Sequence, residues 1–337
     1  MREAMLYEKK DNEQVACRLC GHRCLIKPGA RGICAVRENK GGILYSLVYG
    51  LVIAENIDPI EKKPLFHLYP GSRSYSIATA GCNFRCTFCQ NHAISQMPRE
   101  SGEVVGRPAT PEEIVARALR AGAKTISYTY TEPTIYFEYA YDIAVLARER
   151  GIGNIFVTNG FMTKEALHLI GPLLDGANVD LKSFRDEFYH TYCGARLQPV
   201  LDTLQAMKSL GMWVEVTTLL IPGLNDSDEE LREIARFLAT LGTETPWHIS
   251  RFHPCYRMGD KPATPIEPIH RAVRIGKDAG LLHVYSGNIP GDEGEHTRCG
   301  VCGKKLIGRY GFQIEEMVLV GGKCPYCGHI LAGRFSA

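Results

Sequence analysis

The sequence predicts an α/β fold, a partial (β/α)6 barrel of the TIM type with a cysteine-rich region at each end. Three observations support this prediction. Strand-like and helix-like runs alternate six times between residues 74 and 295. Eleven of the thirteen cysteines fall into three tight groups. A chain of 337 residues with 45% hydrophobic content is long enough for one barrel-sized domain and small appendages.

The alternating pattern defines the barrel elements in order. Strands are expected at residues 75–79, 125–130, 154–158, 177–181, 213–221 and 247–252, with an edge strand at 281–285. Helices are expected at residues 111–121, 134–150, 163–174, 199–210, 227–241 and 268–279. Thr110 and Pro111 supply an N-cap and a first-turn proline for the first helix. Periodicity alone also fits an open doubly wound sheet, so that topology remains the alternative.

The cysteine groups set the expected domain boundaries. We expect a metal-binding N-terminal region at residues 1–73, the barrel at residues 74–295 and a four-cysteine ribbon at residues 296–337. The two remaining cysteines, Cys193 and Cys255, stand alone in the barrel. In a large chain, cysteines grouped in this way indicate metal binding more than disulfides.

The N-terminal group follows the pattern C-x2-C-x3-C-x9-C, formed by Cys17, Cys20, Cys24 and Cys34. Four thiolates among tight turns are typical of a metal site. Zinc and an additional [4Fe–4S] cluster both fit the pattern. His22 lies within the group, but we do not assign it as a ligand.

The second group, Cys82, Cys86 and Cys89, has the spacing C-x3-C-x2-C directly after the first predicted strand. Three thiolates can hold three irons of a [4Fe–4S] cluster, which needs four ligands. The open iron is then free to bind a small chelating molecule and pass it an electron. A structural metal site would close its shell with a fourth residue, so this group indicates chemistry.

The third group consists of two C-x2-C pairs, Cys299 with Cys302 and Cys324 with Cys327. This arrangement is typical of a zinc ribbon or a rubredoxin-like site. Tetrahedral zinc is the expected metal, and a single iron is the alternative.

Charge and hydropathy limit the expected partners and location. A net charge of +2 gives no basic field that would favour nucleic acid or an anionic membrane. The sequence has no apolar run of about 18 residues that would predict a membrane span, and its first residues do not resemble a signal peptide. We therefore expect a cytoplasmic protein without a nucleic-acid or membrane partner.

The C-x3-C-x-aromatic-C run with Phe88 before Cys89 resembles the signature of the radical S-adenosylmethionine (SAM) superfamily. Residues 157–160 and 180–184 are similar to segments of the pyruvate-formate-lyase-activating-enzyme branch. Within that branch the chain, from Cys17 to its last cysteines, most resembles the AmmeMemoRadiSam system radical SAM enzymes, and residues 58–65 resemble a segment typical of that subfamily.

The resemblance implies which strand-end residues contact SAM: Thr131, Glu132, Asn159, Asp180, Lys182 and His253. Thr131 and Glu132 match a segment near the methionine amine, where relatives more often have Gly-Gly-Glu. Asp180 and Lys182 alternate onto one strand face and suit the carboxylate and ribose of SAM. His253 is the first choice for an adenine contact, and His248 is the second. No catalytic residue is assigned beyond the three cluster cysteines.

The resemblance also implies the reaction. Reductive cleavage of SAM gives methionine and a 5′-deoxyadenosyl radical, which abstracts hydrogen from an unidentified protein or small molecule. The alternatives are a glycyl-radical-enzyme activase and, from another class, a non-catalytic zinc-ribbon binding protein. The implied partners are an external one-electron donor of flavodoxin or ferredoxin type and a protein substrate or a Memo-like or AMMECR-like protein.

Overall fold

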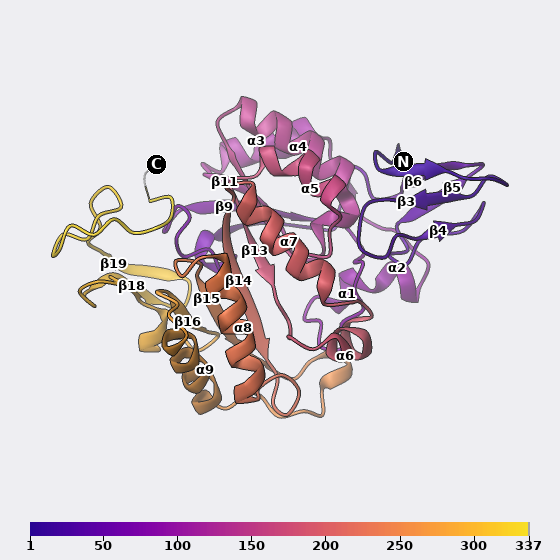
Figure 1. The fold of residues 1–337 in the computed structure, drawn as a ribbon. Helices are drawn as coiled ribbons and strands as arrows, with labels where there is room; N and C mark the ends of the chain where they lie inside the picture. The colour runs from indigo at the N-terminus through magenta and orange to yellow at the C-terminus, as the bar shows by residue number, and fades with distance from the viewer. Residues whose placement is uncertain (336–337) are drawn as a thin grey trace.

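The computed structural model describes residues 1–335, and its centre is an eight-stranded sheet (Figure 1). The strands lie in the order β16 (Val284–Gly287), β15 (Trp247–Arg251), β14 (Trp213–Leu220), β13 (Gly176–Asp180), β12 (Gly153–Thr158), β11 (Thr125–Tyr128), β9 (Arg73–Ala78) and β8 (Ala54–Pro59). All are parallel except β8, which is antiparallel to β9. The parallel strands follow chain order without a reversal, so the sheet is a partial barrel and the doubly wound alternative is wrong.

The six predicted strands are all present, and the expected edge strand is β16. Their residues are almost all buried, as expected for parallel strands covered on both faces. The antiparallel strand β8 was not predicted. It lies before residue 74, in the region assigned to the cysteine-rich head, yet it pairs with β9 along its whole length.

Six longer helices alternate with the parallel strands: α3 (Pro111–Arg120), α4 (Phe137–Glu149), α5 (Lys164–Ile170), α7 (Gln198–Ser209), α8 (Asp228–Leu241) and α9 (Ile266–Asp278). Thr110 and Glu113 form a reciprocal capping box at the start of α3. Helix α4 begins later than expected because Glu132 caps a 3-10 turn at Pro133–Tyr136. Helix α5 ends at Ile170, where a second 3-10 turn contains Pro172.

The remaining elements are short. In the N-terminal head, β1 (Arg2–Glu3), β6 (Ile43–Ser46) and β5 (Arg37–Lys40) form one sheet, and β2 (Tyr7–Lys9), β3 (Val15–Cys17) and β4 (Leu25–Ile26) form another. The barrel adds the pair β7 (Leu51–Val52) and β10 (Arg107–Pro108), and the short helices α1 (His92–Ser95), α2 (Met97–Glu100) and α6 (Asp186–Phe188). The ribbon contains β17 (Thr297–Arg298), β18 (Lys305–Tyr310) and β19 (Gln313–Met317). Figure 1 shows the head beside α1 and α2, and the ribbon beside β16 and α9.

Residues 60–69, which we call the plug, lie across the amino ends of the strands. The plug amides of Phe66 and His67 donate to the two carboxylate oxygens of Glu215, the third residue of β14. The Pro64 carbonyl accepts from Nδ2 of Asn178, the third residue of β13. The plug therefore closes the end of the barrel opposite to the loops that follow the strands.

The ribbon is attached to the plug. Arg309 is fully buried, donates to the Phe66 carbonyl at 3.0 Å and stacks its guanidinium 4.0 Å above the Phe66 ring. Arg334 N donates to the His67 carbonyl, and Tyr69 N donates to the Arg334 carbonyl.

Among the helices of residues 1–335, none is long and apolar enough to cross a membrane.

Candidate active site

Cys82, Cys86 and Cys89 lie in the loop after β9, at the carboxyl end of the first parallel strand. Cys86 is buried, and the other two are half-buried. The loop amides of Arg85 and Thr87 donate to carbonyls of the π-helical turn Tyr189–Cys193, each at 2.9 Å. The active-site loop is therefore fastened to the segment that follows β13.

Cys82, Cys86 and Cys89 do not form a compact four-ligand group. Within residues 1–335, ligand atoms of three or more cysteine, histidine or acidic residues come within 4.8 Å of one another only in the C-terminal group. Sulfurs around one tetrahedral zinc lie about 3.8 Å apart, because each Zn–S bond is about 2.3 Å. Thiolates on a [4Fe–4S] cluster lie roughly 6 Å apart, because each binds a different iron corner. The three cysteines of this loop are therefore compatible with a cluster.

The ionisation of the loop cysteines depends on their burial and on Cys193. Burial raises the pKa of Cys82 and of Cys89 above the ordinary thiol value. A hydrogen bond from the Cys193 thiol lowers the pKa of Cys86. Two of the three sulfurs would therefore be neutral at pH 7 without a bound metal, and metal binding must release their protons.

Cys193 was not predicted to belong to the site, because 104 residues separate it from Cys89. Its thiol is fully buried against Cys86. The Cys193 thiol therefore contributes to the electrostatics of Cys86 in the active-site loop.

Cys255 is the second cysteine that sequence reasoning left unassigned. Its thiol donates to the Phe88 carbonyl at 3.3 Å, and the nearby Arg257 amide donates to the Thr87 carbonyl at 3.0 Å. The loop after β15 therefore packs against the active-site loop. In the sequence, the only feature that set Cys193 and Cys255 apart was their position outside the three cysteine groups.

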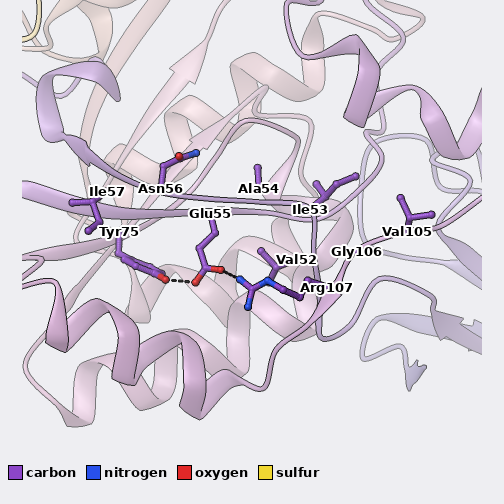
Figure 2. A pocket seen from close by; sticks show the side chains of 10 residues that line it. All are labelled: Val52, Ile53, Ala54, Glu55, Asn56, Ile57, Tyr75, Val105, Gly106 and Arg107. Atoms are coloured by element: carbon purple, nitrogen blue, oxygen red, sulfur yellow. Dashed lines mark hydrogen bonds and ion pairs between the residues drawn. The ribbon is translucent and has the colours of Figure 1, made fainter.

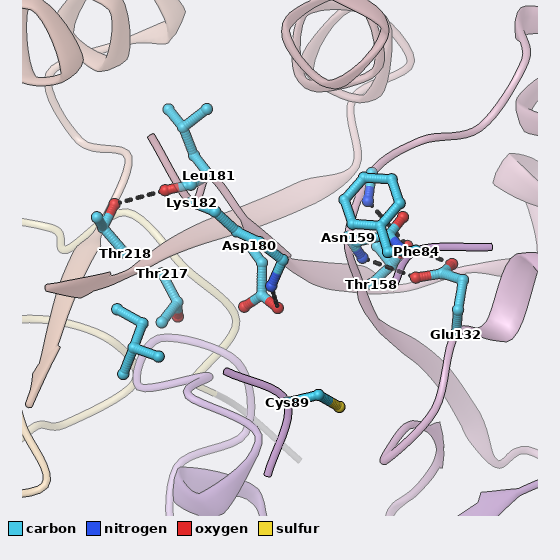
Figure 3. Close-up of polar contacts among 12 residues, drawn as sticks. Phe84, Cys89, Glu132, Thr158, Asn159, Asp180, Leu181, Lys182, Thr217 and Thr218 are labelled. Carbon is cyan, nitrogen blue, oxygen red and sulfur yellow. Dashed lines mark hydrogen bonds and ion pairs between the residues drawn. The ribbon is translucent and has the colours of Figure 1, made fainter. Parts of the chain in front are cut away.

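Glu132 is buried between the ends of β11 and β12. Its carboxylate accepts hydrogen bonds from Thr158 Oγ1 at 2.7 Å and from Asn159 N at 2.8 Å (Figure 3). It also accepts from Thr134 N at 3.0 Å. Burial raises the pKa of Glu132, although these hydrogen bonds oppose the shift. Thr131 is also engaged, because its hydroxyl donates to the Thr79 carbonyl at 2.8 Å.

Asn159 connects β12 to the active-site loop. Its Nδ2 donates to Asn83 Oδ1 at 2.7 Å and lies 3.9 Å from Cys82 Sγ. Its Oδ1 accepts from Phe161 N at 3.0 Å. The Asn159 side chain therefore positions Asn83, the residue next to Cys82. Both its amide nitrogen and its amide oxygen already take part in hydrogen bonds within the protein.

Asp180 and Lys182 lie on one face of the chain as expected, with Lys182 Nζ 2.8 Å from Asp180 Oδ2 (Figure 3). Burial lowers the pKa of Lys182, but Asp180 and the Cys86 and Cys193 thiols together raise it well above the ordinary value. The ammonium is thus a permanent positive charge beside Cys86. The Asp180 side chain is 36% exposed and is available to a ligand.

The two candidate histidines lie in different places. His253 is exposed in the loop that follows β15. His248 is buried near the amino end of β15, where its Nε2 lies 2.7 Å from Glu215 and its ring meets Phe66 of the plug. Only His253 is at the carboxyl end with the cysteine loop.

The C-terminal cysteines form a compact site. The four sulfurs lie within 4.8 Å of one another, with Cys299 and Cys327 3.6 Å apart and Cys302 and Cys324 3.7 Å apart. These distances fit one tetrahedral ion on four thiolates. The donor set accepts zinc or iron, so the metal remains open.

A separate groove lies away from the cysteine loop. A groove of ≈ 660 Å³ runs along β8 and is lined by residues such as Ile53, Ile57 and Val105 (Figure 2). The Glu55 carboxylate in it is paired with Tyr75 and Arg107. No cluster cysteine lines this groove, so we do not place the reaction there.

Comparisons with known proteins agree with this geometry. The Radical SAM superfamily profile matches residues 76–238. An uncharacterized protein of Methanocaldococcus jannaschii is 49% identical over 331 residues, covering 97% of this chain and 98% of that protein. The pyruvate formate-lyase-activating enzyme of Clostridium pasteurianum is 25% identical over 178 residues, covering 51% of this chain and 71% of that enzyme.

A solved structure shares the fold. The crystal structure of a radical SAM methyltransferase from Sphaerobacter thermophilus aligns with a TM-score of 0.50 at 21% identity, covering 68% of this chain and 71% of that chain. At this identity the similarity concerns the fold alone.

Proposed function

The chain belongs to the radical SAM superfamily and is a radical SAM enzyme, and from this premise we propose its reaction. We propose that it cleaves SAM reductively and uses the resulting 5′-deoxyadenosyl radical to abstract hydrogen from a protein or small-molecule substrate. The main support is the C-x3-C-x2-C group of Cys82, Cys86 and Cys89 at the carboxyl end of the first parallel strand of the barrel.

The bound [4Fe–4S] cluster and SAM supply the one-electron cleavage of the sulfonium bond, which releases methionine. The residues of this chain hold and tune that centre. Asn159 fixes the segment next to Cys82, and the turn ending at Cys193 fixes the segment around Cys86. Lys182 places its positive charge beside Cys86 and stabilises the added electron.

We propose that Asp180, Lys182 and His253 contact SAM directly. Asp180 ends β13 and His253 follows β15, so both lie at the carboxyl end of the barrel, one on each side of β14, and present accessible polar atoms. Thr131, Glu132 and Asn159 were also expected to contact SAM, but their polar atoms are largely taken by hydrogen bonds within the protein. For these three we favour a positioning role over direct binding.

A glycyl-radical activase is the second candidate. Relatives named as pyruvate formate-lyase-activating enzymes and as a glycyl-radical enzyme activating enzyme support it. Both outer cysteine groups lie outside the matched residues 76–238, which favours an enzyme with additional metal centres, as the AmmeMemoRadiSam resemblance implies. We propose a flavodoxin or ferredoxin as electron donor, a Memo-like or AMMECR-like protein as partner, and a cytoplasmic location.

The test is SAM cleavage by anaerobically purified protein with dithionite, followed by assay of 5′-deoxyadenosine and methionine. We expect cleavage by the wild type, loss of cleavage in Cys86→Ala, and retention in Cys255→Ser, which keeps a donor for the Phe88 carbonyl. A colourless protein that does not cleave SAM after anaerobic reconstitution would favour the non-catalytic zinc-ribbon alternative and reject the proposal.

A further inference from the structure

The four cysteines of the N-terminal head lie in one region of the fold. Cys17 N donates to the Cys24 carbonyl at 2.9 Å, which brings the end of β3 against the turn that contains Cys20. Every pair among the four thiols interacts electrostatically, including the pairs that Cys34 makes with the other three. Cys17 and Cys20 are buried, and the other two are half-buried. Residues far apart in the head therefore share one site.

The head cysteines are arranged less compactly than the C-terminal ones. In the C-terminal group all four sulfurs lie within 4.8 Å of one another, whereas no three head cysteines within the described residues 1–335 do so. Sulfurs around a single zinc ion lie about 3.8 Å apart, and a four-iron cluster holds them roughly 6 Å apart. The less compact arrangement of the head is compatible with a cluster.

A buried positive charge lies beside the head cysteines. Arg37 is 1% exposed, and its Nη2 is paired with Glu138. Within residues 1–335, its Nε and Nη1 have no hydrogen-bond partner. The guanidinium interacts electrostatically with Cys17 and Cys34. Unpaired buried donors are costly, and an anionic cluster on four thiolates would place compensating negative charge near this guanidinium.

The head site touches the active-site loop through hydrogen bonds. His22, between Cys20 and Cys24, has its Nε2 2.8 Å from the carbonyl of Asn83, the residue after Cys82. Arg99 Nη2 donates both to the carbonyl of Ile33, next to Cys34, and to the carbonyl of Cys82, at 2.9 and 3.2 Å. Ligand segments of the two sites are thus joined directly.

We propose that Cys17, Cys20, Cys24 and Cys34 hold a second, fully ligated [4Fe–4S] cluster that passes single electrons to the SAM-binding cluster. A flavodoxin or ferredoxin supplies each electron, which reduces the head cluster and then moves to the active-site cluster, with no bond made or broken. The electron-transfer part rests on the proposed SAM cleavage, whereas the presence of the cluster does not.

Metal analysis and EPR spectroscopy test the presence of the cluster. The variant Cys82→Ala/Cys86→Ala/Cys89→Ala should retain about four irons, and its reduced EPR signal should not change with SAM, because a closed cluster offers no open iron. A variant that contains zinc in the head and no iron would overturn the proposal. If it does not fold, the reduced wild type decides. Two EPR signals, of which SAM shifts one, support the proposal, and a single SAM-sensitive signal rejects it.

The electron path is tested with Cys20→Ala/Cys34→Ala and two reductants. The loss in SAM cleavage should be at least about tenfold larger with reduced flavodoxin than with dithionite, which is small enough to reach the active-site cluster directly. An equal loss with both reductants would overturn the path. If the wild type contains two clusters but does not cleave SAM, the proposed function alone is rejected. If the wild type cleaves SAM but contains zinc in the head, this inference alone is rejected.

Discussion

Lys182 and Asp180 place opposite charges beside the same sulfur, so their removal should have opposite effects. Lys182→Met removes a positive charge near Cys86 and should lower the reduction potential of the cluster by tens of millivolts. Asp180→Asn should raise the reduction potential of the cluster, because it removes the negative charge of Asp180 near Cys86.

EPR-monitored redox titration measures both potentials. Lys182→Arg serves as the control because it keeps the charge. Shifts of the same sign in Lys182→Met and Asp180→Asn would contradict the electrostatic role and indicate a general disturbance of the loop.

His283 is a second residue whose charge state matters. Burial lowers its pKa to about 2, and burial likewise lowers the pKa of the neighbouring His67 to about 4. The unfolded chain takes up these protons near pH 6.5, whereas the folded chain does not. The free energy of unfolding should therefore fall as the pH decreases below about 6.5, by at most about 1.4 kcal/mol per pH unit for each histidine.

His283→Phe should reduce this pH dependence, because the ring that resists protonation is gone. Urea unfolding between pH 7 and pH 5 measures the slope, with the exposed His168→Phe as control. An unchanged slope in His283→Phe would place the acid sensitivity in other groups, such as the metal thiolates.

At the scale of elements, the turn from β12 to α5 depends on Gly160. Its φ is +69°, and an added Cβ would lie 2.8 Å from Val179 and 3.2 Å from Val200. Gly211 has a similar φ of +72° but no atom within 4 Å of the added Cβ. Gly211→Ala should cost about 1 kcal/mol from backbone strain, and Gly160→Ala about 1–3 kcal/mol more from crowding.

Denaturant unfolding measures both costs, and iron content reports on the adjoining Asn159. Equal destabilisation by the two variants would mean that Val179 and Val200 move aside without cost.

The sequence was sufficient to predict the barrel elements, because strand periodicity, caps and prolines act locally. Thr110 and Pro111 began α3 as expected. The later start of α4 was not predictable, because it depends on Glu132 reaching residues of another strand end. The strand β8 was missed because its residues alternate little and pair only with β9.

The same limit applies to the site. Cysteine spacing predicted three metal-ligand groups, since ligand spacing is a local property. The C-terminal group is compact as expected, and the ligand roles of the other two groups stay predictions. The contacts of Cys193, Cys255 and His22 with the active-site loop join distant segments and required the structure. The positions of His248 and His253 along the strand also required the structure. His248 lies near the amino end of β15, and His253 follows its carboxyl end.

At the scale of the whole molecule, the ribbon secures the plug from outside the barrel. Cys302→Ser should weaken the C-terminal metal site and loosen the contacts of Arg309 and Arg334 with residues 66–69. We expect faster amide hydrogen exchange in the plug and a lower Tm, because metal binding in such ribbons contributes directly to folding.

Hydrogen exchange monitored by mass spectrometry checks this prediction, and the exchange of the cysteine loop at the other end serves as the internal reference. Unchanged plug exchange after verified metal loss would show that the ribbon folds without its ion.

The buried contact between Cys86 and Cys193 has a consequence for handling the protein in air. Once oxygen has stripped the iron, a ligand thiol is left facing a second thiol inside the protein, and we expect these two to cross-link first. A disulfide there would block one ligand position and prevent cluster reassembly until a thiol reductant opens it. Peptide mapping of air-exposed protein would reveal the bond, and Cys193→Ser should recover its iron without added reductant.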